Sequence, residues 1–330
     1  GSLPKGGGVV LVTTRMNRIL KIDTDNLIAV VEPGVVTGDL QDAVESLGLF
    51  YPPDPASLRF STIGGNVAEC AGGPRAVKYG VTKDFVLGLE VVLPTGDIIT
   101  TGGETYKGVV GYDLTKLLCG SEGTLGIITR IVLRLLPLPE TRTTMLAVFD
   151  SIDGAAGAVA AIIRGRIIPT TLEFLDHSAL TCVEGEFSLG IPSAARAVLL
   201  IELDGEKELV EKQAARIGDL IRPLGLIEFK AAADAAEAEE LWKARRLVSP
   251  ALRKVNPDKI NEDIAVPRNR VPDIIRRIDE IREKYGIPII NFGHAGDGNI
   301  HVNIMIDRSK PGETEKAEDA VREIFRATLD

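Results

Sequence analysis

The sequence predicts an α+β protein made of two units. Short apolar runs separated by glycine and proline fill the first third of the chain and indicate strands and turns. Beyond residue 140, strand-like runs and helical periodicities follow in the order β-α-β twice, which is typical of a ferredoxin-like α+β layer. Pro137 and Pro139 lie between the two patterns, so we expect units at residues 1–138 and 139–330.

The first unit should be rich in short strands and contain one clear helix. Thr37 opens that helix, Leu40, Val44 and Leu47 recur on one face of it, and Gly48 ends it. The next prolines, in Tyr51-Pro52-Pro53-Asp54-Pro55, predict a rigid loop. Strands are expected at residues 9–12, 19–22, 29–31, 87–93, 98–101 and 127–136.

The second unit should alternate strands with longer helices. Strands are expected at residues 145–149, 172–175, 197–203 and 226–229. Helices are expected at residues 152–163, 206–221, 231–255 with a break at Pro250, 268–285 and 314–329. Residues 287–306 predict a hairpin with Ala295-Gly296-Asp297-Gly298 at its tip.

Composition excludes several classes of function. A net charge of −9 and only 5% aromatic residues argue against binding to nucleic acid. No apolar run reaches the length of a membrane span. The three cysteines form no C-x-x-C pair, so no iron–sulfur cluster or zinc knuckle is expected. A sparse, odd cysteine count fits a reducing compartment, so we expect a cytoplasmic protein that reaches a membrane only through a partner.

The predicted hairpin holds two of the three histidines in the chain. With a four-residue loop, His294 lies opposite Asn299, and His301 is its diagonal neighbour on the same face of the sheet. Two imidazoles so placed can bind one metal cation, with a third ligand from elsewhere. Asp297 or Glu262 would serve equally, and the alternative is two ordinary polar residues near a loop tip.

Two clusters of small residues, 61–73 and 120–126, lie within 60 residues of each other. Neither is a dinucleotide fingerprint nor a P-loop. Irregular backbone of this kind can bind a phosphate or a flat ring through its N–H groups, although such glycines also serve plain turns. Together the clusters favour a large ligand.

Arg245 occupies an otherwise apolar helical stripe. Leu241, Arg245 and Val248 share one face, with Trp242 beside them. An arginine there needs an anionic partner, such as a substrate carboxylate. The alternative is that its aliphatic stem lies along the apolar surface and its guanidinium reaches water.

Spaced motifs along the whole chain resemble the FAD-linked 2-hydroxy-acid oxidase and dehydrogenase family, which includes D-lactate dehydrogenase, the glycolate oxidase flavin subunit and D-2-hydroxyglutarate dehydrogenase. The motifs that carry the resemblance are Pro52-Pro53-Asp54-Pro55, Thr62-Ile63-Gly64-Gly65-Asn66, Ala71-Gly72-Gly73, Lys78-Tyr79-Gly80, Gly111-Tyr112-Asp113-Leu114, 120–127, Leu241-Trp242-x-x-Arg245 and 293–301. In detail, the sequences of these motifs most resemble those of bacterial glycolate oxidase flavin subunits.

The resemblance implies a partial FAD-binding domain of the vanillyl-alcohol-oxidase type, followed by a ferredoxin-like substrate cap. It implies that His294 and His301 bind zinc or manganese and that Arg245 and Asn303 bind substrate. Some relatives have a substrate-binding lysine where this chain has Asn261. The residues that would contact non-covalent FAD are Pro53, Thr62, Gly64, Gly65, Asn66, Cys70, Gly72, Gly73, Tyr79, Gly80, Glu122, Gly123, Gly126 and Ile127.

Two family segments fall outside this chain, which starts at Gly1 and not at methionine. One is a glycine-rich pyrophosphate loop before Gly1. The other follows Asp330 and in the family supplies a third metal ligand and the catalytic base. We therefore expect a piece of a longer protein, incomplete at both ends, that binds FAD poorly and is inactive by itself.

The implied reaction is oxidation of glycolate or D-lactate to the 2-oxo acid, with hydride passing to FAD. A separate acceptor then takes the electrons: an iron–sulfur partner, an electron-transfer flavoprotein or a quinone. The alternatives are a non-catalytic FAD-fold subunit of a larger oxidase, a D-2-hydroxyglutarate-type dehydrogenase, and an oxidase that uses O₂ and covalent FAD.

Overall fold

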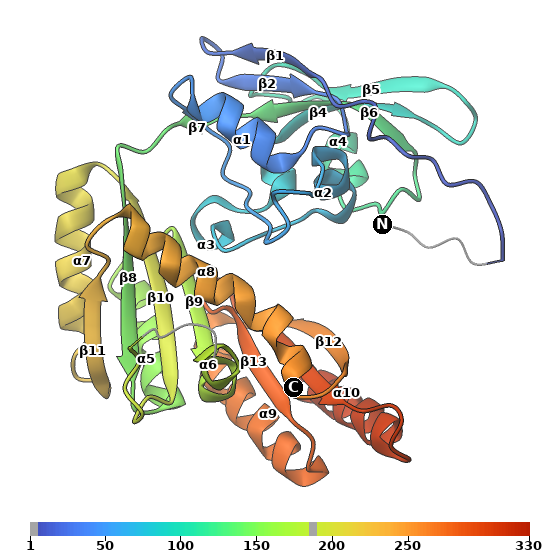
Figure 1. Ribbon diagram of the computed structural model, residues 1–330. Coiled ribbons are helices and arrows are strands. Elements are labelled where there is room, and N and C mark those ends of the chain that lie inside the picture. Colours follow the sequence, from blue (N-terminus) through green and yellow to red (C-terminus); the bar gives the residue numbers. More distant parts are fainter. Residues whose placement is uncertain (1–5, 185–189) are drawn as a thin grey trace. The chain divides into compact units, whose positions relative to one another are not determined.

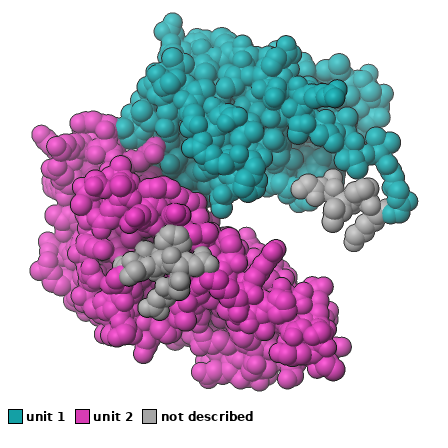
Figure 2. Space-filling model, in the orientation of Figure 1, with its two compact units in different colours: residues 1–139 teal, residues 140–330 magenta. Residues whose placement is uncertain are grey.

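The computed structural model describes residues 6–184 and 190–330, so the opening Gly1-Ser2 lies outside the described residues. The chain divides into two compact units, unit 1 (Gly1–Pro139) and unit 2 (Glu140–Asp330), drawn in two colours in Figure 2. Each unit has its own hydrophobic core and is described by itself.

Unit 1 is built on an antiparallel sheet of five strands. Its strands, in spatial order, are β1 (Ile19–Asp23), β2 (Ile28–Val31), β6 (Ile127–Arg134), β4 (Val86–Val92) and β5 (Ile98–Gly102). A second, two-stranded pairing joins β3 (Leu49–Phe50) to β7 (Leu136–Pro137). The helical segments are α1 (Thr37–Glu45), α2 (Ile63–Glu69), α3 (Ala76–Tyr79), η1 (Thr82–Asp84) and α4 (Leu114–Leu118).

Three expectations for unit 1 need correction. The predicted strand at residues 9–12 is irregular and exposed, because an apolar run forms a strand only where a neighbour pairs with it. The predicted helix ends at Glu45, so Leu47 lies beyond the helix and is exposed. The strand predicted at 127–136 is divided into β6 and β7, which pair with different strands.

Unit 2 is built on an antiparallel sheet of seven strands in the order β11-β8-β10-β9-β13-β14-β12. The first four strands in sequence, β8 (Thr141–Phe149), β9 (Thr171–Asp176), β10 (Ala197–Gly205) and β11 (Leu226–Ala231), lie side by side in the spatial order fourth, first, third, second. That is the ferredoxin-like order, so the predicted topology of the cap is confirmed. The hairpin β13 (Ile289–His294) and β14 (Asn299–Ile306), with β12 (Asp258–Ala265), extends the same sheet.

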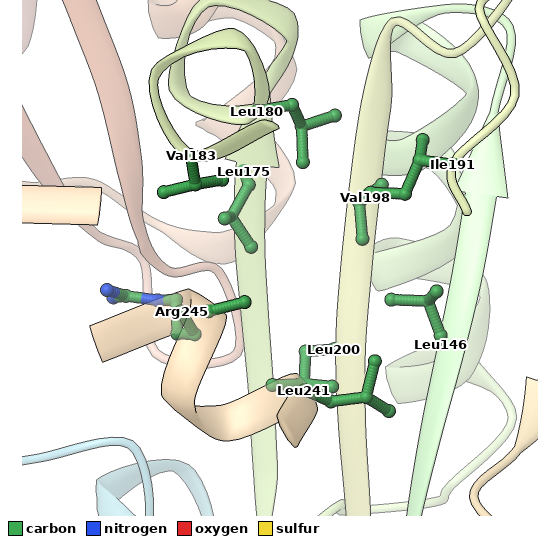
Figure 3. Close-up of a pocket in the computed structure, with 10 residues that line it drawn as sticks. Leu146, Leu175, Leu180, Val183, Ile191, Val198, Leu200, Leu241 and Arg245 are labelled. Atoms are coloured by element: carbon green, nitrogen blue, oxygen red, sulfur yellow. The ribbon is translucent and has the colours of Figure 1, made fainter. Parts of the chain in front are cut away.

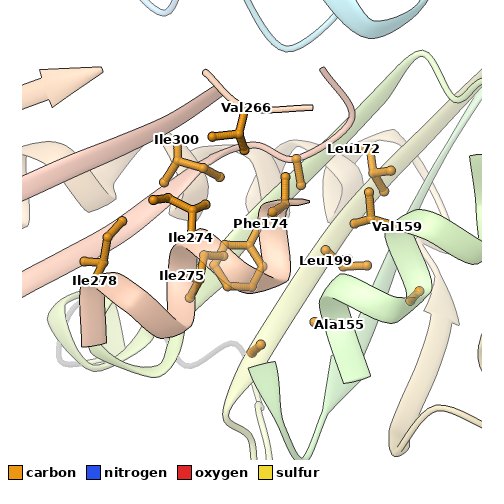
Figure 4. Packing of buried hydrophobic residues seen from close by; sticks show 14 of the residues in the cluster. Ala155, Val159, Leu172, Phe174, Leu199, Val266, Ile274, Ile275, Ile278 and Ile300 are labelled. Carbon is orange, nitrogen blue, oxygen red and sulfur yellow. The ribbon is translucent and has the colours of Figure 1, made fainter. Parts of the chain in front are cut away.

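Helices cover both faces of this sheet (Figure 1). One face packs against α5 (Ile152–Arg164), α7 (Lys207–Ile221), α9 (Val271–Tyr285) and α10 (Glu313–Leu329). Figure 4 shows Val159 of α5 and Ile274 of α9 packed against Phe174 and Leu199 of the strands. The other face packs against α6 (His177–Glu184) and α8 (Ala235–Ala251).

Side chains alternate along each strand, so neighbouring residues face the helices on opposite sides of the sheet. On β9, Leu172 and Phe174 enter the larger core, whereas Glu173 and Leu175 point to the face covered by α6 and α8. Glu173 thus lies on the same face of the sheet as His294, His301 and Asn303, which are described below.

The helix predicted at residues 231–255 is shorter than expected. Strand β11 runs through Ala231, so the helix starts later than predicted. The Asp234 side chain accepts the Glu237 N–H at 2.9 Å and caps the N-terminus of α8. Pro250 lies inside the last turn of α8, and a short helix, η2 (Leu252–Lys254), follows. Another short helix, η3 (Arg268–Arg270), precedes α9.

Candidate functional site

The hairpin has the register that the sequence predicts. His294 pairs with Asn299 across a four-residue turn, and His301 is two residues further along β14. The two imidazole rings meet edge to face, with centroids 5.0 Å apart. The predicted proximity of the two histidines is therefore confirmed.

A carboxylate holds each histidine by its Nδ1 atom. His294 Nδ1 lies 2.5 Å from Glu173 Oε1 on β9, and His301 Nδ1 lies 2.7 Å from Asp263 Oδ1 on β12. An ionised carboxylate only accepts hydrogen bonds, so each Nδ1 carries the proton and donates it. The Nε2 atom of each ring is then the one free to bind a metal or another donor.

The carboxylates proposed from the sequence are not the ones that contact the histidines. Asp297 Oδ1 accepts the Asn299 N–H at 3.0 Å and thereby shapes the turn. Glu262 is adjacent to Asp263 in β12, so alternation turns it to the opposite face from His301.

Arg245 has an internal anionic partner. Its Nε donates to Glu173 Oε2 at 2.7 Å, and a terminal nitrogen lies 2.6 Å from the same oxygen. The guanidinium also lies over the Phe292 ring, 4.8 Å from its centroid. The anionic partner expected for an arginine in an apolar stripe is thus Glu173, a residue that the sequence patterns did not identify.

The predicted register of α8 is confirmed. Leu241 and Val248 are buried, and Arg245 lies between them on the same face. Arg246 is 45% exposed in its side chain and pairs with Glu239 on the outside of the helix.

Arg245 lines one side of a pocket that is otherwise apolar (Figure 3). In Figure 3 the nitrogen-bearing end of Arg245 points away from the leucines and valines. The remaining lining residues are all apolar: Leu146, Leu175, Leu180, Val183, Ile191, Val198, Leu200, Leu241 and Ala244. Among the described lining residues only Arg245 carries a polar side chain, and its guanidinium points toward Glu173.

Charges at this site shift the pKa values of its members. Burial works against ionisation of Glu173, but the charges of His294 and Arg245 outweigh it and lower the pKa of this carboxyl to about 2. Burial also works against protonation of His294, yet Glu173 raises the pKa of that imidazole. The hydrogen bond from His301 lowers the pKa of Asp263.

Asn303 is fully buried on the same face, two residues after His301. Its amide nitrogen donates to the carbonyls of Ile290 and His301, each at 3.2 Å. Among the described residues its Oδ1 has no hydrogen-bond partner. Asn261, which lies opposite Asn303 on β12, donates to Asp263 Oδ1 at 3.4 Å.

A nearby lysine was also missed by sequence reasoning. Lys259 precedes Asn261 by two residues on the same face of β12, and its Nζ donates to Ser249 Oγ of α8 at 3.0 Å. Burial lowers the pKa of this lysine.

In unit 1 the first cluster of small residues folds mostly as helix α2. The Thr62 hydroxyl accepts the Gly65 N–H at 3.3 Å and caps this helix, and Cys70 ends it with a left-handed backbone. The Asn66 side chain points inward and donates to Thr37 Oγ1 at 2.7 Å. Several N–H groups that we expected to serve a ligand therefore bond within the protein.

The second cluster docks directly on α2. Gly120 N donates to Val67 O at 2.9 Å, and Glu122 N donates to Ala68 O at 3.0 Å. Gly123 follows, and Ile127 starts β6. The structure thus brings together the two clusters that the sequence linked.

Two further segments join this region. Thr82 N donates to Ala71 O, which places Tyr79 and Gly80 beside the end of α2. The buried loop around Pro53 is anchored by Gln41 Nε2, which donates to Pro53 O at 2.9 Å.

Six glycines of these clusters fall into two classes. In one class a Cβ atom would clash with Pro33, Asp54 or Val91, so close packing within the protein already requires glycine; these are Gly64, Gly73 and Gly126. In the other class a Cβ would meet ordinary contacts or open space; these are Gly65, Gly72 and Gly123. Gly65 and Gly123 are exposed and Gly72 is partly exposed, so a ligand can approach their backbone.

Comparison with known proteins matches both units to flavoprotein domains. Residues 138–330 match the family described as FAD linked oxidases, C-terminal domain, and residues 1–102 match the family described as FAD binding domain. The chain belongs to the FAD-linked oxidase family. Among the residues that the structure describes, no helix of this family member is long and apolar enough to cross a bilayer.

Several relatives of this FAD-linked oxidase match nearly its whole length. It is 49% identical to glycolate oxidase subunit GlcD of Bacillus subtilis, over 100% of this chain and 70% of the relative. It is 38% identical to subunit GlcD of Escherichia coli, over 97% and 64%, and 32% identical to a D-lactate dehydrogenase of Anaerostipes hadrus, over 96% and 68%. The chain therefore spans about two thirds of the length of these relatives.

Solved structures confirm the predicted fold class. A structure of p-cresol methylhydroxylase with bound substrate aligns over 95% of this chain and 69% of its own, with a TM-score of 0.77 at 19% identity.

The hairpin offers two imidazoles, which are too few ligands to make a metal site by themselves. Metal-binding histidines commonly donate their second ring N–H to a carboxylate, as both histidines do here. Within the described part of the chain, no three histidine, cysteine or acidic residues gather closely enough to hold a metal ion. A metal at this hairpin needs at least one ligand besides His294 and His301.

Proposed function

We propose that this protein oxidises a small 2-hydroxy acid, glycolate or D-lactate, to the 2-oxo acid with FAD as the hydride acceptor. The observation that carries the proposal is the convergence of Arg245, His294, His301 and Asn303 on one face of the cap sheet. The guanidinium of Arg245 beside two imidazoles suits a substrate that carries a carboxylate next to a hydroxyl. The relatives named glycolate oxidase subunit and D-lactate dehydrogenase support this class of substrate.

The side chains of the cap would bind and orient the substrate. Glu173 uses two of the five N–H donors of Arg245, which leaves three for a substrate carboxylate. The Oδ1 of Asn303, which has no hydrogen-bond partner among the described residues, is an acceptor on the same face. Holding the carboxylate fixes which face of C2 is presented for hydride transfer.

His294 and His301 would hold a divalent metal, zinc or manganese, through their Nε2 atoms. When bound, such a metal polarises the substrate hydroxyl and lowers its pKa. Glu173 raises the pKa of His294, and a metal binds only the neutral ring, so protonation of this imidazole competes with metal binding.

Unit 1 would hold the cofactor, with residues 1–138 as a partial FAD-binding domain and residues 139–330 as the substrate cap. The exposed backbone at Gly65, Gly72 and Gly123 and the docking of loop 120–127 on α2 support FAD contacts there. FAD, when bound, takes the hydride from C2 of the substrate. The proposed contacts are Pro53, Thr62, Gly64, Gly65, Asn66, Cys70, Gly72, Gly73, Tyr79, Gly80, Glu122, Gly123, Gly126 and Ile127.

Reduced flavin must pass its two electrons to another acceptor. The relatives named as subunits of glycolate oxidase support a protein partner, and we propose an iron–sulfur or electron-transfer protein in the cytoplasm.

Anaerobic titration of the flavoprotein tests the proposal. We expect glycolate or D-lactate to bleach the flavin absorbance near stoichiometry, with one of the two acting at much lower concentration. A flavin spectrum that neither acid changes would contradict the proposal and favour a non-catalytic FAD-fold subunit.

A further inference from the structure

Glu173 joins the two halves of the candidate site. It is fully buried on β9, and its two oxygens serve different side chains. Oε1 accepts from His294 of β13, and Oε2 accepts from Arg245 of α8. One carboxylate therefore fixes a ring that comes from the hairpin and a guanidinium that comes from the covering helix.

We propose that Glu173 is a positioning residue that prepares His294 for the metal and Arg245 for the substrate carboxylate at the same time. This inference rests on the proposed function, since it takes those two roles as given. It adds that the two binding events depend on one buried side chain that touches neither metal nor substrate.

The effect on His294 follows from the tautomer. With Nδ1–H donated to Glu173, the lone pair lies on Nε2, the atom that faces away from the carboxylate. A glutamine at position 173 would present either an acceptor or a donor to that nitrogen. With the donor facing the ring, the lone pair would move to Nδ1, which would leave Nε2 protonated and unable to bind a metal.

The effect on Arg245 follows from its two bonds to Oε2. They hold the guanidinium over Phe292 with one edge turned to Glu173, so the other edge is presented in a single orientation. Without the carboxylate, a guanidinium whose side chain is only 12% exposed loses its counter-charge, and the side chain is free to rotate.

Three variants separate the two roles. Asp263→Asn removes the partner of His301 alone, so it should weaken metal binding and leave KM for the hydroxy acid unchanged at saturating metal. Arg245→Ala should raise KM and leave metal affinity unchanged. Glu173→Gln should do both: metal affinity falls about 10- to 100-fold, and KM at saturating metal rises about tenfold.

Glu202→Gln is the matched control for the loss of a buried glutamate. Glu202 lies on the same sheet face in the neighbouring strand β10, where it accepts from Trp242 Nε1 at 3.1 Å and Thr144 Oγ1 at 3.2 Å. Its replacement should perturb fluorescence of Trp242, the single tryptophan of the chain, and leave metal affinity and KM near wild type.

Metal affinity is measured on the holoenzyme by competition for Zn²⁺ with a chromophoric chelator, independently of turnover. If Glu173→Gln keeps wild-type metal affinity, or wild-type KM at saturating Zn²⁺, the inference is wrong while the proposed function stands. If the wild-type enzyme itself binds neither Zn²⁺ nor hydroxy acid, the proposed function fails instead.

A second measurement covers the case in which Glu173→Gln does not fold. The chain has three histidines, so ¹⁵N spectra of the metal-free wild-type protein can be assigned with single substitutions. We expect neutral His294 to carry its proton on Nδ1. A neutral ring protonated on Nε2 would overturn the inference without any variant at position 173.

Discussion

At the scale of single residues, the site depends on carboxylates that local sequence patterns do not reveal. Glu173 lies between Leu172 and Phe174 in the strand Thr171–Asp176, and every position of that strand is buried. A charged residue between two large apolar residues of a strand is the signal that could have identified it, because buried charges are paired. Its partner His294 is 121 residues away, so only the order of the strands shows which residue it meets.

The histidines provide a direct test at this scale. If the proposed metal site exists, His301→Ala should lower the Zn²⁺ or Mn²⁺ content of the enzyme and its turnover together, because one of the two proposed imidazole ligands is lost. His177→Ala is the control, since His177 Nδ1 contacts only the Ala195 carbonyl in the described structure. Metal content by atomic emission and turnover after chelation check both variants; equal metal content in the two would count against the hairpin site.

At the scale of elements, the hairpin and its turn place the histidines. Gly298 has φ +88°, and a Cβ on it would lie 2.0 Å from the Val266 carbonyl oxygen. That carbonyl belongs to the segment after β12, with which the turn pairs through Val266 N and Gly298 O at 3.1 Å. Glycine at position 298 lets the turn pack against the segment that follows β12. This packing fixes the position of His294.

Two glycine substitutions separate backbone strain from this close approach. Gly286 ends α9 with φ +61° and nothing within 4 Å of its Cβ position, so Gly286→Ala should cost about 1 kcal/mol from backbone strain alone. Gly298→Ala must also displace the turn from Val266, so we expect a loss of about 3 kcal/mol or more, together with weaker metal binding. Urea denaturation and metal titration measure both; similar losses for the two variants would contradict the docking argument.

At the scale of the whole molecule, each unit carries its own core, and the second unit holds a buried charge that links its stability to pH. Asp176 is buried at the end of β9 and accepts the N–H groups of Ala179 at 2.7 Å and Asn291 at 3.0 Å. Burial raises the pKa of this carboxyl to about 6. The folded protein therefore binds this proton more tightly than the unfolded chain does.

The sign of the pH effect follows from that difference. Between the unfolded pKa, about 4, and the folded value, about 6, the folded state holds more protons, so the free energy of unfolding falls as pH rises. The loss by pH 7 should be about 3 kcal/mol relative to Asp176→Asn, which does not titrate. Unfolding curves of both proteins from pH 4 to 7 measure it; a constant difference between them would rule out a raised pKa.

Across the whole chain, the sequence predicts most helices and strands, and it predicts both the position and the register of the histidine hairpin. The hairpin was predictable because its turn residues and apolar alternation are local, and the face of α8 because Leu241, Arg245 and Val248 repeat at helical spacing. The strand expected at residues 9–12 failed because pairing depends on a neighbour. Glu173 and Asp263 were missed because strand order, unlike periodicity, is a property of the folded sheet.

In our proposal, the inner face of α8 and the hairpin bind the 2-hydroxy acid that reduces the flavin. Rapid mixing of oxidised enzyme with glycolate or D-lactate under anaerobic conditions, in wild type, Arg245→Ala and Arg246→Ala, tests it most directly. Arg245→Ala should weaken the apparent substrate affinity about 10- to 100-fold with FAD content unchanged, because a charge-assisted bond to a carboxylate is lost. Arg246, exposed and paired with Glu239, should tolerate alanine with near wild-type reduction. A silent Arg245→Ala beside a damaging Arg246→Ala would show that the substrate binds elsewhere.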